Sequence, residues 1–272
     1  MDKNREKIRR SLTSILAYNP LKQFVFRVTG KRISFNHLTI RIIAFFLRQR
    51  IPFYGSVIDV SSRTISPLTK SLLYYGLYEQ NEVRLVKKYL REDDDVIELG
   101  ASIGVIGSVL SRIQTTGRYV AVEADPTLAD IIAKNLSINR TVAYTLVSKA
   151  IDYTKETVSF AAGGNTLAGK LINDDNGKNA AITVDTITLD EICTGLNLAV
   201  FTLICDIEGA EIGLLLNDDK ALANCEKMII ELHETQYDNR VYPIREMVEL
   251  ILAKKYEVLD NCGNVFVFAK MR

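Results

Sequence analysis

Residues 95–104, DVIELGASIG, decide the fold of this chain together with RYVAVEADP at residues 118–126. The apolar start of the first segment predicts a buried strand, a glycine-bounded bend follows, and residues 105–113 have a helical apolar pattern. The second segment predicts a short strand that ends at Glu123. A strand, turn, helix and strand ending in an acid is typical of a ribose-binding unit, because a carboxylate accepts hydrogen bonds from both vicinal hydroxyls.

The spacing of the glycines separates two kinds of ligand. A dinucleotide site uses G-x-G-x-x-G, whose second glycine lets the backbone approach a pyrophosphate, whereas here Ala101, Ser102 and Ile103 separate Gly100 from Gly104. Glu98, just before the turn, would repel a pyrophosphate and attract an ammonium group. S-adenosylmethionine has an ammonium group and a ribose diol but no phosphate, so the pattern favours it over NAD. The alternative is a turn whose glycines serve packing only.

Two later segments place polar residues at strand ends. Residues 201–215, FTLICDIEGAEIGLL, indicate a buried strand ending at Asp206 and a turn into a helix. Residues 227–234, KMIIELHE, indicate another buried strand. Its end carries three polar residues, Glu231, His233 and Glu234. Ligands of open α/β sheets bind at the carboxyl ends of the strands, so we expect these side chains at the site.

Together these segments resemble the FkbM family of S-adenosylmethionine-dependent methyltransferases. The matching pieces run in the family's order: GLYEQNEVRLVKKYL (76–90), DVIELGASIG (95–104), VAVEADP (120–126), VDTITLDEI (184–192), CDIEGAEI (205–212) and IIELH (229–233). DIEGAE combined with ELH is specific, whereas the ELGxxxG turn alone indicates only a class I methyltransferase. Ser102 stands where the family commonly has an asparagine, and residues 1–70 carry no part of the resemblance.

The resemblance implies a cofactor, its binding residues and a reaction. The cofactor is S-adenosylmethionine. The residues predicted to bind it are Glu79, Glu98, Gly100, Ala101, Ser102, Gly104, Glu123, Ser148 and Asp206. The implied reaction is O-methylation of hydroxyl groups on sugars or other secondary metabolites, often in surface-polysaccharide or natural-product pathways.

The segment D-I-E-G at residues 206–209 indicates the kind of nucleophile. Amine methyltransferases commonly have D/N-P-P-Y/F at this place, so the difference favours an oxygen nucleophile. We predict that His233 is the general base, with Asp206 and Glu208 as further catalytic residues, because a histidine titrates near neutral pH. The alternative is a strand-end histidine bonded to a backbone group. Glu211 is expected near a helix N-terminus, where its negative charge is favourable.

A divalent cation is an alternative that we do not favour. Asp206, Glu231 and Glu234 could supply the hard oxygen ligands that Mg²⁺ prefers, and some sugar O-methyltransferases use such a cation. The four cysteines have no metal-binding spacing and are expected to be reduced thiols that serve as small apolar residues.

The alternation of strands and helices beyond residue 95 predicts an α/β fold of the class I methyltransferase (Rossmann-like) type. We expect a doubly wound, mostly parallel seven-stranded sheet, with one antiparallel strand from the hairpin at 257–269. At 272 residues the chain is long enough for one catalytic domain, residues 76–272, behind a basic, mainly helical extension, residues 1–75.

Other segments are less regular. In the extension, residues 55–62 are expected to form a strand, Pro67 to mark a turn, and residues 70–90 to form a helix. Residues 152–182, with a turn at Gly163, Gly164 and Asn165, interrupt the alternation. They are expected to form a lid or substrate loop over the strand ends or, alternatively, a solvent loop.

Charge is distributed unevenly. Residues 1–50 contain twelve Lys and Arg against two acids, whereas the other 222 residues contain 22 basic and 31 acidic residues. The basic segment, interleaved with aromatic and aliphatic residues, could lie on an anionic membrane, hold an acidic glycan or lipid-linked precursor, or simply cap the catalytic domain with solvated charges. Nucleic acid is not expected, since no binding motif accompanies the charge.

Composition and chain start predict a cytoplasmic enzyme, with possible peripheral contact to the inner face of a membrane. No apolar run approaches the ~20 residues of a spanning helix, and the start MDKNREKIRR lacks the apolar core of a signal peptide. We expect an O-methyltransferase acting on a sugar hydroxyl of a surface glycan or its lipid-linked precursor. The alternatives are a small secondary metabolite as acceptor, or a non-catalytic binding partner that keeps the fold.

Overall fold

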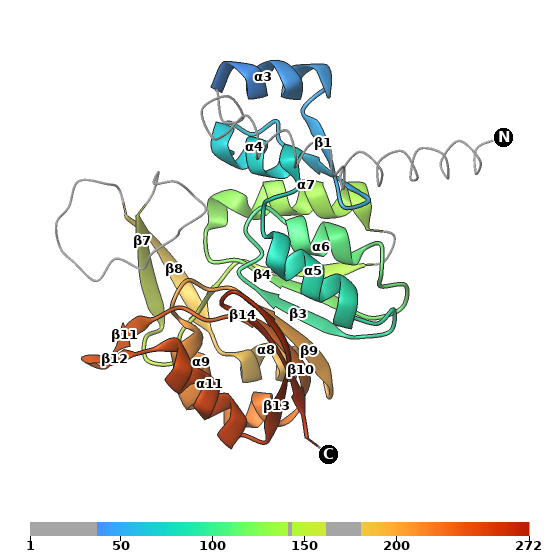
Figure 1. Cartoon of the computed structure of the whole chain (residues 1–272). Coiled ribbons are helices and arrows are strands. Elements are labelled where there is room, and N and C mark those ends of the chain that lie inside the picture. The colour runs from blue at the N-terminus through green and yellow to red at the C-terminus, as the bar shows by residue number, and fades with distance from the viewer. Residues whose placement is uncertain (1–36, 141–142, 162–180, 272) are drawn as a thin grey trace.

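The computed structural model describes residues 37–140, 143–161 and 181–271, and its centre is a seven-stranded sheet (Figure 1). The strands stand in the order β13-β14-β10-β9-β3-β4-β5. Their bounds are β3 Val96–Leu99, β4 Tyr119–Val122, β5 Tyr144–Val147, β9 Phe201–Cys205, β10 Cys225–Glu231, β13 Tyr256–Cys262 and β14 Val265–Lys270. Neighbours are parallel except where β14 meets β10 and β13. The predicted mostly parallel sheet with one antiparallel strand is confirmed.

Helices cover both faces of this sheet, as expected of a doubly wound fold. One face carries α5 (Gln80–Tyr89), α6 (Val105–Leu110) and α7 (Ala129–Asn139), the last entered through the short η1 (Pro126–Leu128). The other face carries α8 (Leu189–Gly195), α9 (Glu211–Asn217), α10 (Asp219–Ala223) and α11 (Ile244–Ala253). Each face has its own apolar cluster between sheet and helices. In β3, Val96 packs into the cluster under α5, α6 and α7, and Ile97 into the cluster under α8 to α11, because successive strand residues point to opposite faces.

The described part of the N-terminal extension contains α3 (His37–Phe46), the hairpin of β1 (Arg50–Phe53) and β2 (Ser56–Asp59), and α4 (Pro67–Tyr75). The strand expected at residues 55–62 is present as β2 but is shorter, and its partner β1 was not predicted. Tyr54 and Gly55 both have positive φ (43° and 89°), which favours a two-residue turn, and β2 pairs antiparallel with β1. The predicted helical character of residues 1–36 lies outside the described residues.

Pro67 begins a helix instead of marking a turn. The Ser66 side chain accepts a hydrogen bond from the Thr69 N–H, and a proline in the first helical position loses no hydrogen bond. Gly76, in the left-handed region at φ 70°, then ends α4. The predicted helix at residues 70–90 is therefore two helices, α4 and α5.

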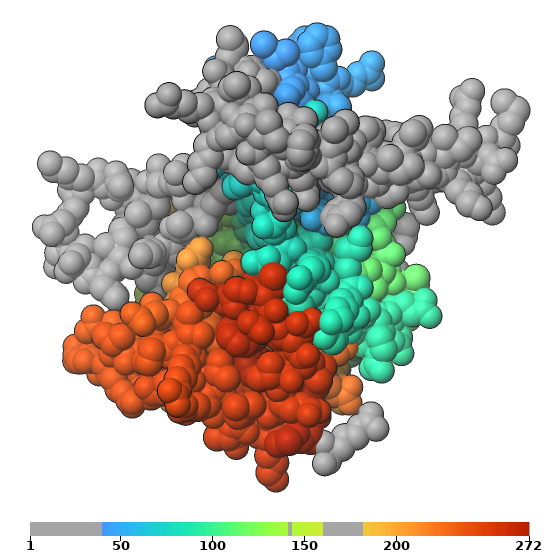
Figure 2. Space-filling view, in the orientation of Figure 1, coloured from blue at the N-terminus to red at the C-terminus, as the bar shows by residue number. Residues whose placement is uncertain are grey.

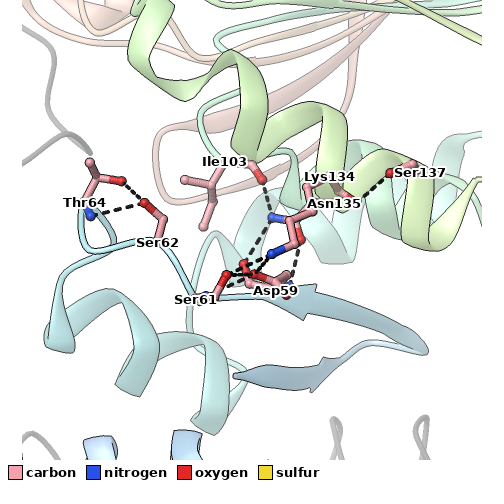
Figure 3. Close-up of polar contacts among 8 residues, drawn as sticks. All are labelled: Asp59, Ser61, Ser62, Thr64, Ile103, Lys134, Asn135 and Ser137. Atoms are coloured by element: carbon pink, nitrogen blue, oxygen red, sulfur yellow. Dashed lines mark hydrogen bonds and ion pairs between the residues drawn. The ribbon is translucent and has the colours of Figure 1, made fainter. Parts of the chain in front are cut away.

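Hydrogen bonds and an ion pair connect the β1–β2 hairpin to α7 (Figure 3). Asn135 Oδ1 accepts a hydrogen bond from the Asp59 N–H at 2.7 Å, and Asn135 Nδ2 donates to the Ile103 carbonyl at 2.8 Å. Lys134 Nζ lies 2.9 Å from Asp59 Oδ1. Apolar side chains of the extension share one core cluster with α5 and α6; they include Ile51, Phe53, Ile58, Val60 and Leu73. Residues 37–75 thus pack against the α/β domain and share its core. The predicted domain boundary at residue 75 stays a prediction.

The flanks of the predicted insertion are regular. Strands β6 (Ala150–Ile151), β7 (Thr157–Ala161) and β8 (Ala181–Ile187) form a small sheet in the order β6-β8-β7. Residues 162–180, including the expected Gly163–Asn165 turn, lie outside the described residues, so the lid stays a prediction. A second hairpin, β11 (Thr235–Tyr237) and β12 (Arg240–Tyr242), follows His233 and was not predicted.

Within the described residues, no helix combines the length and apolar character needed to cross a membrane.

Candidate active site

The turn after β3 is held in an unusual backbone conformation. Gly100, Ser102 and Gly104 have φ values of 87°, 49° and 76°. A Cβ at Gly100 would lie 1.8 Å from the Asp206 carbonyl oxygen, so only glycine fits between the ends of β3 and β9. The Gly100 and Ala101 N–H groups donate to the Val122 carbonyl at 2.9 and 3.0 Å. The glycine therefore serves the close approach of two loops and positions the backbone of the turn.

Glu123 lies beside this turn, as predicted. Its Oε2 accepts a hydrogen bond from the Ser102 N–H at 2.7 Å, and its Oε1 accepts from the Asp125 N–H at 2.9 Å. Burial raises the pKa of this carboxyl, and these backbone donors oppose the shift. Each oxygen keeps a second lone pair, so the carboxylate can still accept from the hydroxyls of a ribose.

Three other predicted cofactor residues, Ser102, Ala101 and Ser148, differ in their contacts and in their exposure to solvent. Ser102 Oγ is 3.2 Å from the Tyr78 hydroxyl, which connects the turn to the segment just before α5. Its left-handed backbone would equally suit the asparagine that the family commonly has. Ala101 is buried, and Ser148, just after β5, is exposed. Ser148 makes no described contact with the turn, so its role stays a prediction.

Glu98 lies beneath the turn. It is 2% exposed and accepts a short hydrogen bond from the Tyr119 hydroxyl. A Cβ at Gly107 would be 2.2 Å from that hydroxyl, which places the pair between the sheet and α6. Burial raises the pKa of Glu98 to about 8, and both the Tyr119 hydroxyl and the Arg140 guanidinium lower it. Contact of Glu98 with an ammonium group stays a prediction, because its carboxyl is already engaged within the core.

Asp206 occupies the point where β3 and β9 end side by side. Its N–H donates to the Leu99 carbonyl at 3.0 Å, and its Oδ1 is buried without a hydrogen-bond partner. Burial, together with the nearby Glu231 and Glu208 carboxyls, raises the pKa of Asp206 to about 7. A buried carboxyl oxygen with no partner among the described residues is suited to a donor or a cation on a ligand.

His233 is paired with a carboxyl that sequence reasoning assigned to a helix terminus. Its Nδ1 lies 3.0 Å from Oε1 of Glu211, which is fully buried and also accepts from the Ile207 N–H at 3.2 Å. His233 Nε2 is 3.8 Å from Glu208 Oε2 and 3.9 Å from Glu231 Oε1. The hydrogen bond to Glu211 raises the pKa of His233 to about 9 against the opposing effect of burial.

In this arrangement the hydrogen bond to Glu211 fixes His233 Nδ1, and Nε2 lies toward Glu208 and Glu231 near the end of β10. A carboxylate only accepts hydrogen bonds, so Glu211 fixes the proton on Nδ1 and leaves Nε2 for exchange with a ligand. The motif CDIEGAEI contained the signal for Glu211. The sequence did not show that Glu211 contacts His233, because that contact depends on β9 and β10 being neighbouring strands.

Further carboxyls lie near Asp206, and their burial favours the protonated form in the absence of a ligand. Burial and mutual repulsion with Asp206, Glu98 and Glu231 raise the pKa values of Glu79 and Glu82 well above the usual range. Glu79 was predicted as a cofactor residue, whereas Glu82, in the first turn of α5, was not. A cluster of this kind favours a cationic ligand, because a positive charge relieves the repulsion.

The described residues contain one group of side chains that could hold a metal ion, and it differs from the alternative considered above. Among the described residues, the group whose ligand atoms all lie within 4.8 Å of one another is Asp206, Glu211 and His233. Glu234 is exposed, since it stands one residue past His233 and alternate residues of an extended segment point to opposite sides. The unfavoured alternative of Asp206, Glu231 and Glu234 does not form such a group among the described residues. The hydrogen bond between Glu211 and His233 accounts for two members of the new group without a metal.

The sheet order, the glycine turn after β3 and the acid at the end of β4 define a class I methyltransferase fold. The chain belongs to the FkbM methyltransferase family: residues 98–264 match the Methyltransferase FkbM domain. The resemblance predicted from the motifs is thereby confirmed, and the protein is a methyltransferase by family.

The chain is also similar, at low sequence identity, to several solved structures. A protein of the NADB-Rossmann superfamily from Streptococcus agalactiae is 13% identical, with 70% of this chain and 69% of that chain covered and a TM-score of 0.40. A putative RNA methyltransferase from Pyrococcus horikoshii is 11% identical, with 72% and 83% covered and a TM-score of 0.41. Aeropyrum pernix fibrillarin, solved with natively bound S-adenosyl-L-methionine, is 11% identical, with 70% and 75% covered and a TM-score of 0.39. No curated protein sequence matches the chain.

Proposed function

We propose that this protein is an S-adenosylmethionine-dependent O-methyltransferase that methylates a sugar hydroxyl of a surface glycan or of its lipid-linked precursor. The proposal includes a cytoplasmic site of action, at the inner face of the membrane. The observation that carries the O-methyl assignment is the Glu211–His233 pair, because it presents a histidine nitrogen at the strand ends where an acceptor hydroxyl would lie.

The residues of the site fit the cofactor. Glu123 would accept hydrogen bonds from the ribose diol, and Ser102 and Gly104 shape the turn beside it. The unpartnered Oδ1 of Asp206 and the carboxyls around it, Glu79 and Glu231, suit the positive groups of the methionine end. When bound, S-adenosylmethionine supplies a methyl group on a positively charged sulfur.

His233 would act as the general base. Its Nε2 would take the proton of the acceptor hydroxyl as that oxygen receives the methyl group that bound S-adenosylmethionine would supply. Glu211 keeps Nδ1 protonated and stabilises the imidazolium that results. Glu208 and Glu231, whose oxygens lie 3.8 and 3.9 Å from Nε2, can orient the hydroxyl by accepting hydrogen bonds from its neighbours on a sugar ring.

The carboxyls also favour an acceptor that is neutral or cationic around the reacting hydroxyl. An anionic group at this point would meet Asp206, Glu208 and Glu231 at once. The acceptor can carry negative charge only at a distance from the strand ends. A sugar hydroxyl remote from the phosphate of a lipid-linked precursor satisfies this condition, and so does an uncharged secondary metabolite.

Calorimetric titration with S-adenosylhomocysteine, the demethylated product, tests the proposal first. We expect binding in the micromolar range for the full chain and its loss in Glu123→Ala. Glu123→Gln keeps one carbonyl acceptor for the turn and separates loss of ribose binding from loss of the fold. Glu234→Ala is the matched control, because it removes an exposed carboxyl from the end of β10.

The outcomes distinguish the remaining alternatives. If the folded protein does not bind S-adenosylhomocysteine, the catalytic proposal fails and a non-catalytic binding partner becomes the better account. If it binds, transfer of a labelled methyl group to lipid extracts, glycans and small metabolites identifies the acceptor class. Label on nitrogen instead of oxygen would contradict the role given to His233.

A further inference from the structure

Helix α3 has one buried and one exposed apolar face. Ile40 and Ala44 are each 1% exposed, and α3 packs on α4. On the other side Ile42, Phe45 and Phe46 are 48%, 73% and 78% exposed. Their spacing of three and four residues puts these three side chains on one side of the helix. Two neighbouring phenylalanines exposed to this degree are not needed for the packing of the fold.

The surroundings of this face are basic. Arg41, Arg48 and Arg50 are exposed on α3 or just after it. The sequence contains no acidic residue between Glu6 and Asp59, and Asp59 is buried and paired with Lys134. Apolar rings next to exposed guanidinium groups, with no carboxylate nearby in the sequence, match the chemistry of an anionic lipid surface, in which rings enter the acyl boundary and cations meet headgroups.

The position of α3 in the fold agrees with such contact. In Figure 1, α3 is at the end of the molecule beyond α4, opposite the C-terminal strands, and in Figure 2 its atoms stand at that same end. Helix α4 leads directly to the site: Gly76 ends it, and Tyr78 then reaches the turn through Ser102. A contact at α3 is thus one helix away from the strand ends.

We propose that the exposed face of α3, formed by Ile42, Phe45 and Phe46 with Arg41 and Arg48, binds the surface of an anionic lipid bilayer. This binding does not depend on methyl transfer. It adds to the proposed function by holding the enzyme where a lipid-linked acceptor would be found.

Vesicle co-sedimentation of the full chain tests the inference. The probes are phosphatidylcholine vesicles with and without phosphatidylglycerol. We expect binding to the mixed vesicles only, reduced about tenfold or more in Phe45→Ser/Phe46→Ser. Removing the charges in Arg41→Gln/Arg48→Gln should weaken it by about fivefold per arginine. The matched control is Val200→Ser/Val241→Ser, which removes two apolar side chains that are 50% and 57% exposed elsewhere on the surface.

The result that supports the inference is loss of binding in both α3 variants, with the control and the melting temperatures unchanged. No binding of the intact chain to anionic vesicles overturns it. Equal binding of the phenylalanine variant also overturns it and would assign any lipid contact to another segment, such as residues 1–36. A change in oligomeric state without a change in lipid binding would show that the face covers a second copy of the chain. Binding of S-adenosylhomocysteine should be the same in all variants, so failure here leaves the proposed function separately testable.

Discussion

The two halves of the candidate site differ in how completely their polar groups are satisfied. Around the turn after β3, the carboxylate of Glu123 accepts two backbone hydrogen bonds and the N–H groups of Gly100 and Ala101 are bonded to β4. At the ends of β9 and β10, Asp206 and Glu211 each keep a buried oxygen that has no partner within the described part of the chain. The polar groups of the first half are hydrogen-bonded within the protein. The second half has buried carboxyl oxygens that can accept hydrogen bonds from a ligand.

The difference shows how the fold divides its tasks. A turn that must hold one shape is stabilised by local hydrogen bonds and by glycine at positive φ. The second half must exchange a proton and attract positive charge. It therefore contains buried carboxyls with raised pKa values, and burying these groups lowers the stability of the fold. Substitution of Gly100 in the first half should therefore affect folding, and substitution of His233 in the second should affect turnover.

The largest effect is expected from Gly100→Ala. The new Cβ would overlap the Asp206 carbonyl oxygen, 1.8 Å away, and the residue would stay at φ 87°. We expect a loss of about 3 kcal/mol or more in the free energy of unfolding, measured by chemical denaturation. The control is Gly195→Ala at the end of α8, where a Cβ meets no atom within 4 Å. Equal stability of the two variants would show that the turn tolerates a shift of β9.

The next effect concerns His233→Gln. We expect turnover to fall by about 10²–10⁴-fold, because a general base is removed, while binding of S-adenosylhomocysteine stays within a few-fold. Glu234→Gln, at the exposed neighbouring position, should leave both unchanged. Product formation with labelled S-adenosylmethionine measures the rate once an acceptor is found. Full activity of His233→Gln would remove the base from the mechanism.

A pH profile distinguishes Glu211 as a positioning residue from a merely structural one. Because the hydrogen bond to Glu211 raises the pKa of His233 to about 9, the base form of the free enzyme accumulates only as pH rises toward that value, and kcat/KM should increase with pH up to about 9. In Glu211→Gln the rising limb should move to lower pH and the plateau should fall. The same pair should stabilise the fold below the ordinary histidine pKa and lose this contribution as pH rises through 9. An unshifted kcat/KM profile in the variant would contradict the pairing.

The smallest effect is expected from Ser102→Asn, which introduces the residue that the family commonly has. At φ 49° an asparagine is tolerated well, so the melting temperature should rise slightly or not change. Loss of the 3.2 Å contact with Tyr78 should alter cofactor affinity by no more than a few-fold, measured by calorimetry. A loss comparable to that of Glu123→Ala would show that the turn depends on the serine hydroxyl.

Much of the fold was predictable from local pattern. The central strands are short apolar runs, and Gly100, Gly104 and Glu123 mark where they end. Errors arose where local signals were ambiguous. Pro67 can mark a turn or begin a helix, and only the bond from the Thr69 N–H to Ser66 settles which. The Tyr54-Gly55 turn was missed because tyrosine seldom adopts positive φ.

By itself the sequence determined the strand and helix alternation, the class of fold and the residues that line the turn after β3. These follow from periodicity, glycine spacing and motif order, which are properties of neighbouring residues. Only the tertiary structure decided that Glu98 lies beneath the turn, that Glu211 pairs with His233 and that Glu234 points away. Glu211 and His233 are 22 residues apart, and they meet because β9 and β10 are parallel neighbours whose carboxyl ends share one edge of the sheet.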